Sequence, residues 1–289
     1  MQSVLGTSAS ETWHPQVFVT KQGPHISKLQ NQLKILMVRQ KKSQHPITSH
    51  GLPYGYNMNT SVVEVANAEA LVAKYVSELS NEDVAADSLL PDWSRGHVIS
   101  HLANNARGLS NLIEWALTGV QKDMYASVEQ RAIDIENDAK RPGKEIVADF
   151  LEQSKIFAAN LDRLMAGPLL SEEVVLGNGS HVHPHEMTTL RERELLVHLV
   201  DLGLGYKAND WTLDWSIKTL KSVSAGKRKE PVKFRLLIAG DHTWTMDQNG
   251  MTDIFGTPQS LAAWLMGREP DDKLVTSDGS PLGNPPLWL

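Results

Sequence analysis

Two stretches of the sequence decide the fold: LPDWSRGHVISHLANNA at residues 90–106 and RERELLVHLVDLG at residues 191–203. Each has apolar residues at helical spacing, so each predicts an amphipathic helix. The first carries His101, and the second carries Glu194 and His198. Residues four apart lie one above the other on a helix, as two ligands of one metal ion must. Two histidines and one glutamate form a catalytic zinc set that leaves a coordination position open.

The ligand assignment has alternatives at two positions. His97 lies four residues before His101, so either histidine could face the metal. Glu194 could instead face solvent and pair with Arg191 and Arg193. A glutamate that faces the interior of a bundle is costly to bury without a cation, which favours the metal site.

Two further features near these helices allow more than one interpretation. His181, His183 and His185 alternate along the chain and could bind a metal from one strand face, but we interpret this segment as a loop. Asp201 lies three residues after His198 and could accept a hydrogen bond from that histidine as an outer partner of the metal. Asp201 could equally cap the last turn of its helix.

The helical patterns predict a bundle for residues 58–205. Its four amphipathic helices are expected at residues 61–79, 94–117, 143–165 and 184–202. Bundles build metal sites from side chains on facing helices.

The remaining C-terminal residues, 206–289, predict a small α+β domain. Residues 233–239 and 242–246 have strand patterns around a Gly-Asp turn, so we expect a strand pair there. A short helix is expected at residues 258–266. The predicted fold class of the chain is therefore α+β, with a helical bundle followed by this small domain.

Residues 1–57 are polar and lack sustained periodicity, so we expect a disordered extension. The helical pattern starts after Met58, which resembles the natural start of the fold. The alternative for the upstream segment is a targeting or regulatory tail.

The composition excludes several classes of partner. The chain has 28 basic and 34 acidic residues and a net charge of −6, which gives no electrostatic basis for binding nucleic acid or an anionic membrane. No apolar run approaches the roughly 20 residues that a membrane span needs. Since the chain has no cysteine and no legible signal peptide, we expect a cytoplasmic protein whose metal is held by nitrogen and oxygen.

Residues 90–106 resemble the L-x-x-W-[ST]-R-x-H-[LV]-x-x-H-[LV]-A-x-N-A motif of mycothiol-dependent maleylpyruvate isomerases. This family belongs to the wider DinB-like metal-binding four-helix bundles. The similarity continues in residues 111–119, 124–131 and 193–203, and the ending at residues 285–289 is similar to the family's P-P-x-W-L terminus.

The resemblance implies particular roles for residues of this chain. His101, Glu194 and His198 would be ligands of zinc or another divalent metal. Arg268 would be an active-site arginine, and Arg131 would be a second one. The substrate that these arginines bind would be a small anionic dicarboxylate, since the arginine fork suits a carboxylate and a developing enolate.

The resemblance also implies an activity, the cis-trans isomerisation of maleylpyruvate to fumarylpyruvate in gentisate-type aromatic catabolism, with mycothiol as thiol co-substrate. A chain without cysteine would have to borrow such a thiol. Two alternatives are a mycothiol S-transferase that acts on electrophiles and a non-catalytic metal-binding DinB-like protein. The C-terminal domain and its P-P-x-W-L ending favour the isomerase, although Leu195 and Leu196 replace the family's usual aromatic residue after the zinc glutamate.

Overall fold

The computed structural model describes residues 61–167, 170, 172–225, 234–238, 243–244 and 252–285. The predicted disordered extension at residues 1–57 lies outside these described residues. The chain divides into a helical unit, Asn57–Ser222, and a second unit that contains Val223–Leu289. This division falls after the boundary at residue 205 that the sequence suggests.

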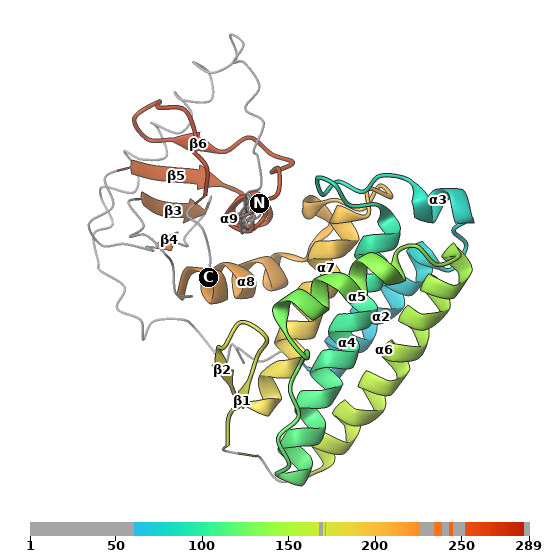
Figure 1. Ribbon diagram of the computed structural model, residues 1–289. Helices are drawn as coiled ribbons and strands as arrows, with labels where there is room; N and C mark the ends of the chain where they lie inside the picture. Colours follow the sequence, from blue (N-terminus) through green and yellow to red (C-terminus); the bar gives the residue numbers. More distant parts are fainter. Residues whose placement is uncertain are drawn as a thin grey trace, which may run out of the picture. The chain divides into compact units, whose positions relative to one another are not determined.

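The helical unit is a four-helix bundle, and the chain as a whole is α+β, as the sequence predicts (Figure 1). Its four long helices are α2 (Val62–Val76), α4 (Arg95–Thr118), α6 (Gly143–Ala166) and α7 (Met187–Asp201). Helix α4 packs against α6 and α7, and α2 packs against α7 and α6. The two helices that carry the candidate ligands, α4 and α7, are therefore neighbours.

Local capping sets where these helices begin and end. Ser61 opens α2 through a reciprocal capping box with Glu64, which satisfies backbone donors of the first turn. Gly119 closes α4 with φ of 71°, a left-handed conformation that glycine adopts without steric cost. The expected fourth helix begins as a 3-10 turn, η1 (Pro184–Glu186), before it continues as α7.

Several shorter elements lie between the long helices or follow the last of them. They are α3 (Asn81–Ala85), α5 (Val128–Asp138), β1 (Val174–Val175), β2 (His181–Val182), η2 (Ala208–Asp210) and α8 (Leu213–Ala225). Strands β1 and β2 pair antiparallel, so His181 lies in a short strand rather than in the loop that we expected. Helix α5 packs against α4, yet Ile135 is its one fully buried residue. An apolar stripe is therefore missing from its sequence, which is why periodicity does not predict it.

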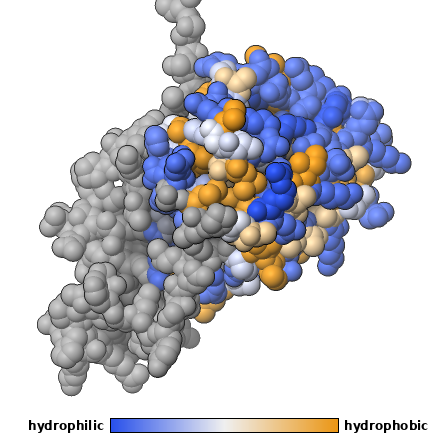
Figure 2. Space-filling model, turned by 90° about the horizontal axis from the view of Figure 1, so that it is seen from below, coloured by the Kyte–Doolittle hydropathy of each residue, from blue (hydrophilic) through white to orange (hydrophobic). Residues whose placement is uncertain are grey.

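The core of the bundle consists of apolar side chains from the inward faces of the long helices. Its largest buried apolar members include Phe150, Phe157, Ile99, Leu102, Leu109, Leu112, Ile113, Ile146 and Leu161. On the face that Figure 2 presents, polar residues cover much of the described surface, and apolar residues gather in groups between them. Among the described residues, no helix has both the length and the apolar character needed to cross a membrane.

The second unit contains a four-stranded sheet of order β4-β3-β5-β6. Its elements are β3 (Phe234–Ile238), β4 (Thr243–Trp244), β5 (Thr252–Gly256), α9 (Pro258–Leu265) and β6 (Val275–Thr276). The predicted strand pair is β3 with β4, which run antiparallel, whereas β3 and β5 run parallel. The predicted short helix is α9, which begins at the N-cap Thr257. Residues 286–289 of the P-P-x-W-L ending lie outside the described part of the chain.

Candidate metal centre

The start of α4 decides which of its two histidines faces α7. The Ser94 backbone N–H donates to Nδ1 of His97 at 3.1 Å, and the His97 backbone N–H donates to Ser94 Oγ at 3.3 Å. These bonds turn the ring of His97 toward the helix start, where its Nε2 lies 3.1 Å from Glu136 Oε2. His101, one turn later, points at Glu194 instead.

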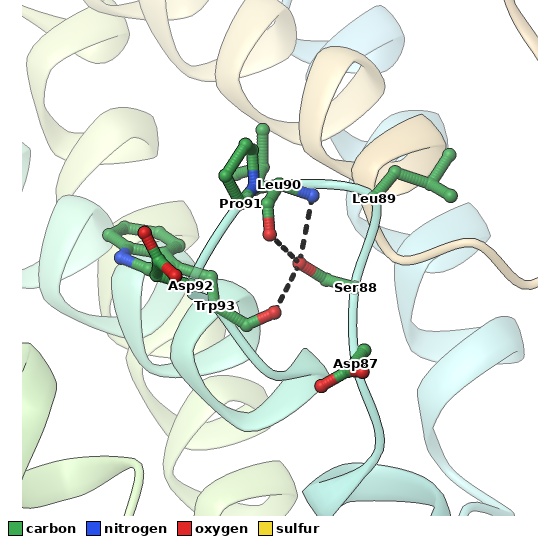
Figure 3. A pocket seen from close by; sticks show the side chains of 7 residues that line it. All are labelled: Asp87, Ser88, Leu89, Leu90, Pro91, Asp92 and Trp93. Atoms are coloured by element: carbon green, nitrogen blue, oxygen red, sulfur yellow. Dashed lines mark hydrogen bonds between the residues drawn. The ribbon is translucent and has the colours of Figure 1, made fainter. Parts of the chain in front are cut away.

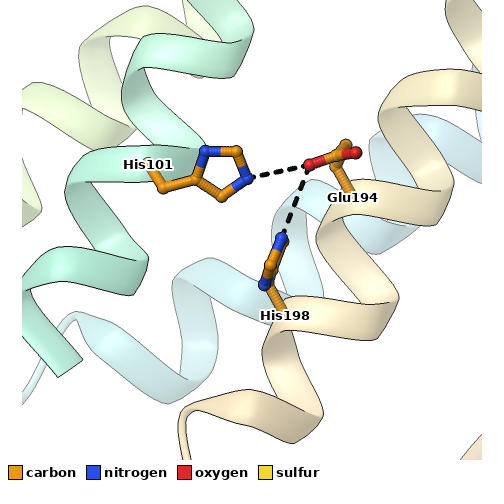
Figure 4. Close-up of side chains that lie close together, drawn as sticks. All are labelled: His101, Glu194 and His198. Carbon is orange, nitrogen blue, oxygen red and sulfur yellow. Dashed lines mark hydrogen bonds and ion pairs between the residues drawn. The ribbon is translucent and has the colours of Figure 1, made fainter. Parts of the chain in front are cut away.

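His101, Glu194 and His198 converge on one point between α4 and α7 (Figure 4). Glu194 Oε2 lies 2.9 Å from Nε2 of His101 and 3.5 Å from Nε2 of His198. The two imidazole rings stand nearly perpendicular, at 81°, with their centroids 4.5 Å apart. The ligand atoms all lie within 4.8 Å of one another, so they are close enough to hold a single ion.

The three side chains differ in exposure. Their exposed fractions are 5% for His101, 13% for His198 and 30% for Glu194. The carboxylate is therefore the most accessible of the three ligands, while the imidazoles are enclosed by the bundle.

Burial and mutual contact shift the acidities of all three groups. Burial lowers the pKa of His101 to about 4, assisted by the nearby charge of His198 and opposed by the hydrogen bond to Glu194. Burial also acts to lower the pKa of His198, but hydrogen bonds to Asp201 and Glu194 outweigh it and raise that pKa above its ordinary value. Burial acts to raise the pKa of Glu194, yet the two histidines hold it well below its ordinary value. The carboxylate is thus ionised at neutral pH, as a metal ligand must be.

Asp201 orients His198. Its Oδ2 lies 2.8 Å from Nδ1 of His198, and the carboxylate is 1% exposed. Of the two interpretations of Asp201, the structure therefore shows the contact with the histidine. When this carboxylate accepts a hydrogen bond from Nδ1–H of His198, the lone pair on Nε2 is free to point at a cation.

Arg131 contacts the other imidazole. Its Nη2 lies 2.9 Å from Nδ1 of His101. A guanidinium can only donate, so Nδ1 is an acceptor in this contact and the proton lies on Nε2, which donates to Glu194. Ligation of an ion through Nε2 requires the proton on Nδ1 instead. A neutral His101 therefore cannot accept from Arg131 and bind an ion through Nε2 at the same time.

The donor set fits a divalent metal ion. Two imidazole nitrogens and one ionised carboxylate suit zinc, and they also suit nickel, cobalt or iron. Among the described residues, this is the one group of three or more histidine, aspartate or glutamate side chains close enough to share an ion.

The loop before α4 borders the centre. A pocket of about 370 Å³ is lined by residues 87–93, whose turn is held by a hydrogen bond of 2.7 Å from Ser88 Oγ to the carbonyl of Trp93 (Figure 3). The indole of Trp93 lies 5.9 Å from the ring of His101 and is stacked on His97 at 6.0 Å. The indole of Trp93 therefore lies beside the rings of both histidines of α4.

Residues 65–203, which include all three candidate ligands, match the model of the mycothiol maleylpyruvate isomerase N-terminal domain. This match lies within the helical unit. A crystal structure of the mycothiol-dependent maleylpyruvate isomerase is similar, at 23% identity and a TM-score of 0.70 over 78% of this chain and 95% of that chain. A histidine-to-alanine mutant of mycothiol-dependent maleylpyruvate isomerase has 22% identity and a TM-score of 0.71 over the same shares. No curated protein matches the chain.

Two further predictions concern residues outside this set of three ligands. Arg268 belongs to the second unit, where its Nη1 donates to the carbonyl of Met266 at 2.6 Å. His181 and His183 flank the carboxylate of Glu173 at 3.5 and 3.9 Å, and His183 stacks on His185 at 5.5 Å. This second histidine cluster contributes no ligand to the candidate centre.

Sequence spacing assigns no role to Tyr125, which lies beside Arg131. The guanidinium carbon of Arg131 lies 5.5 Å from the centre of its ring. Burial raises the pKa of Tyr125, so its phenol stays protonated at neutral pH. The family-like segment 124–131 contains both residues, and that was the available signal for their proximity.

Proposed function

We propose that this protein is an enzyme, a mycothiol-dependent cis-trans isomerase that converts maleylpyruvate to fumarylpyruvate. The observation that carries the proposal is the convergence of His101, Glu194 and His198 within a domain of the isomerase family. The solved structures of similar fold are of mycothiol-dependent maleylpyruvate isomerase. We propose zinc as the resident ion and the cytoplasm, where thiols stay reduced, as the compartment.

Isomerisation requires the cis double bond to become a single bond for a moment. A thiolate sulfur achieves this by adding to one alkene carbon while the π electrons move onto the conjugated carbonyl oxygen. Rotation about the new single bond and expulsion of the same thiolate then give the trans alkene. The thiol has to come from a co-substrate, because the chain contains no cysteine, and we propose mycothiol as that co-substrate. A divalent ion supplies the means to hold a thiol as thiolate at neutral pH.

The protein's own residues have separate tasks in this scheme. His101, Glu194 and His198 would hold the ion, and Asp201 would keep His198 in the tautomer that exposes Nε2. The guanidinium of Arg131 lies against His101, at the edge of the ligand set, where it can bind a substrate carboxylate. Its planar fork suits that anion better than a lysine ammonium would.

Arg268 is the second arginine that we assign to substrate. Its proposed task is to stabilise the negative charge that addition places on the carbonyl oxygen. Replacing Arg268 with lysine should lower kcat/KM by roughly 10²- to 10³-fold, the cost typical of losing one donor to a developing oxyanion.

The assay is the loss of maleylpyruvate absorbance by zinc-loaded protein with and without mycothiol. We expect turnover only when mycothiol is present. His101→Ala should lose this turnover. His97→Ala, which removes the neighbouring histidine of the same helix, should retain it. If the zinc-loaded protein with mycothiol leaves the absorbance unchanged, the isomerase assignment fails. Consumption of an electrophile such as monochlorobimane without isomerisation would indicate the S-transferase instead. Bound metal in a folded protein that turns over neither maleylpyruvate nor the electrophile would indicate the non-catalytic metal-binding alternative.

A further inference from the structure

Arg191 joins all four long helices of the bundle from a fully buried position. Its Nε donates to Glu69 Oε1 on α2 at 2.7 Å, and its Nη1 donates to the Leu102 carbonyl and to Asn105 Oδ1 on α4 at 2.8 and 2.9 Å. Its Nη2 reaches Ser154 Oγ on α6 at 3.4 Å, and that hydroxyl donates to Glu69 Oε2 at 2.7 Å. Arg191 itself belongs to α7.

These contacts lie next to the candidate metal ligands. Leu102 directly follows His101 on α4, and Arg191 lies three residues before Glu194 on α7. Residues three apart on a helix are neighbours on the same side, so the guanidinium and the carboxylate of Glu194 lie on adjacent turns. One side chain therefore fixes the distance between α4 and α7 close to the point where His101 meets Glu194.

Packing alone does not explain a buried arginine at this position. Removing a guanidinium from water is costly, and apolar residues of similar volume can replace buried ion pairs without loss of stability. Apolar contacts hold helices together but allow them to slide, whereas the planar fork of an arginine requires its acceptors at fixed positions. The paired Glu69 and the Leu102 carbonyl thus define a register that apolar packing would leave open.

We propose that Arg191 is a positioning residue, which sets the separation of α4 and α7 so that His101 and Glu194 present their ligand atoms to one ion. This inference rests on the metal-dependent function proposed above. The charge is neutralised within the network by Glu69, so Arg191 acts through the placement of the two helices rather than through contact with the ion or the substrate.

The test measures cobalt(II) affinity and the ligand-field absorption of bound cobalt(II) in wild type and in the double variant Arg191→Met/Glu69→Met. The double variant removes both charges, so no unpaired ion is left in the core. We expect it to fold cooperatively and to bind cobalt(II) about 10- to 100-fold more weakly, the range seen when partners that orient ligands are lost. Its absorption bands should change, because the ligand geometry is relaxed.

The matched control is Leu112→Ala, which opens a cavity at a fully buried position three turns after His101 on the same helix. It should lower the thermal midpoint of unfolding and leave the cobalt(II) affinity and spectrum unchanged. Equal weakening in this control and in the double variant would overturn the positioning role, as would a double variant with wild-type affinity and spectrum.

A conservative variant decides the question if the double variant does not fold. Arg191→Lys keeps the charge beside Glu69 but cannot also reach the Leu102 carbonyl, so we expect cobalt(II) affinity to fall about tenfold. Wild-type affinity in this variant overturns the inference. Failure of wild-type protein to bind cobalt(II) at all would instead overturn the proposed metal-dependent function.

Discussion

Two histidines lie one turn apart on α4 and each meets a glutamate of another helix, but the environments of the two pairs differ. His101 meets Glu194 at 2.9 Å, and His97 meets Glu136 at 3.1 Å, so distance does not separate them. The side chains of the first pair are 5% and 30% exposed, and those of the second are 19% and 56% exposed. A third ligand, His198, joins only the first pair among the described residues. Convergence of a third group and burial, rather than a short contact, thus distinguish the candidate metal centre.

The sharpest way to break this comparison is to neutralise each glutamate in turn. Glu194→Gln removes the only charged ligand, so we expect zinc affinity to fall by more than about 100-fold, beyond the range for outer partners. Glu136→Gln should leave the affinity unchanged, because its partner His97 caps the helix. Competition with a chromophoric chelator measures both. Similar losses in the two variants would show that the metal does not lie where the three ligands converge.

The next largest effect is expected at the residue that orients His198. Asp201→Asn keeps the shape of the side chain but removes the charge 2.8 Å from Nδ1, so zinc affinity should fall about 10- to 100-fold. Asp149→Asn is a suitable control, because Asp149 is a part-buried carboxylate that pairs with Arg107 and Arg141. Chelator competition on the folded variants compares the two. An unchanged zinc affinity in Asp201→Asn would mean that Asp201 only stabilises the last turn of α7 and does not orient His198 for the metal.

The positions of these residues could be predicted from the sequence only in part. Four-residue spacing predicts that Glu194 and His198 share one helix face, and the serine at residue 94 predicts the start of the helix that carries His97 and His101. The same spacing also places His97 beside His101. The hydrogen bond between Ser94 and the ring of His97 sets the side-chain rotamer of His97 and so leaves His101 to face the metal centre. Periodicity describes faces of helices and carries no information on such rotations.

Long-range partners were hidden for a different reason. Arg191 stands in a charged run with Glu192 and Arg193, which is typical of a helix surface. It is nevertheless fully buried, because Glu69 and Leu102 contact it from helices that are distant in the sequence. Likewise, the contact of Arg131 with His101 depends on α5, a helix whose mostly exposed residues leave no apolar stripe in the sequence. Such contacts follow from tertiary packing, which spacing along one helix cannot show.

The pH dependence of metal binding sharpens the contrast between the two ligand histidines. The pKa of His198 is raised above its ordinary value and that of His101 is lowered to about 4. An ion must displace a proton from any ligand that is protonated, so affinity falls as the pH drops below a ligand's pKa. Between pH of about 5 and 6.5, only His198 should release a proton, and affinity should change about tenfold per pH unit.

Chelator competition across this pH range distinguishes one released proton from two. Asp201→Asn should move the onset of the loss to lower pH, because the carboxylate that raises the pKa of His198 is gone. A slope of two protons over the same interval would mean that His101 titrates with His198, and that its burial does not keep it neutral.

The smallest effect is expected for the histidine outside the ligand set. His97→Ala removes the acceptor of the Ser94 backbone N–H, so the free energy of unfolding should fall by about 1 kcal/mol, as for other helix caps, while zinc affinity stays unchanged. Ser94→Ala removes the same capping box from its other side and is the matched control. Urea unfolding of both variants and of the double variant should show that the losses are not additive, because one reciprocal contact is shared. A clear loss of zinc affinity in His97→Ala would mean that the first turn of α4 positions His101, and the two histidine–glutamate pairs would then act as one unit.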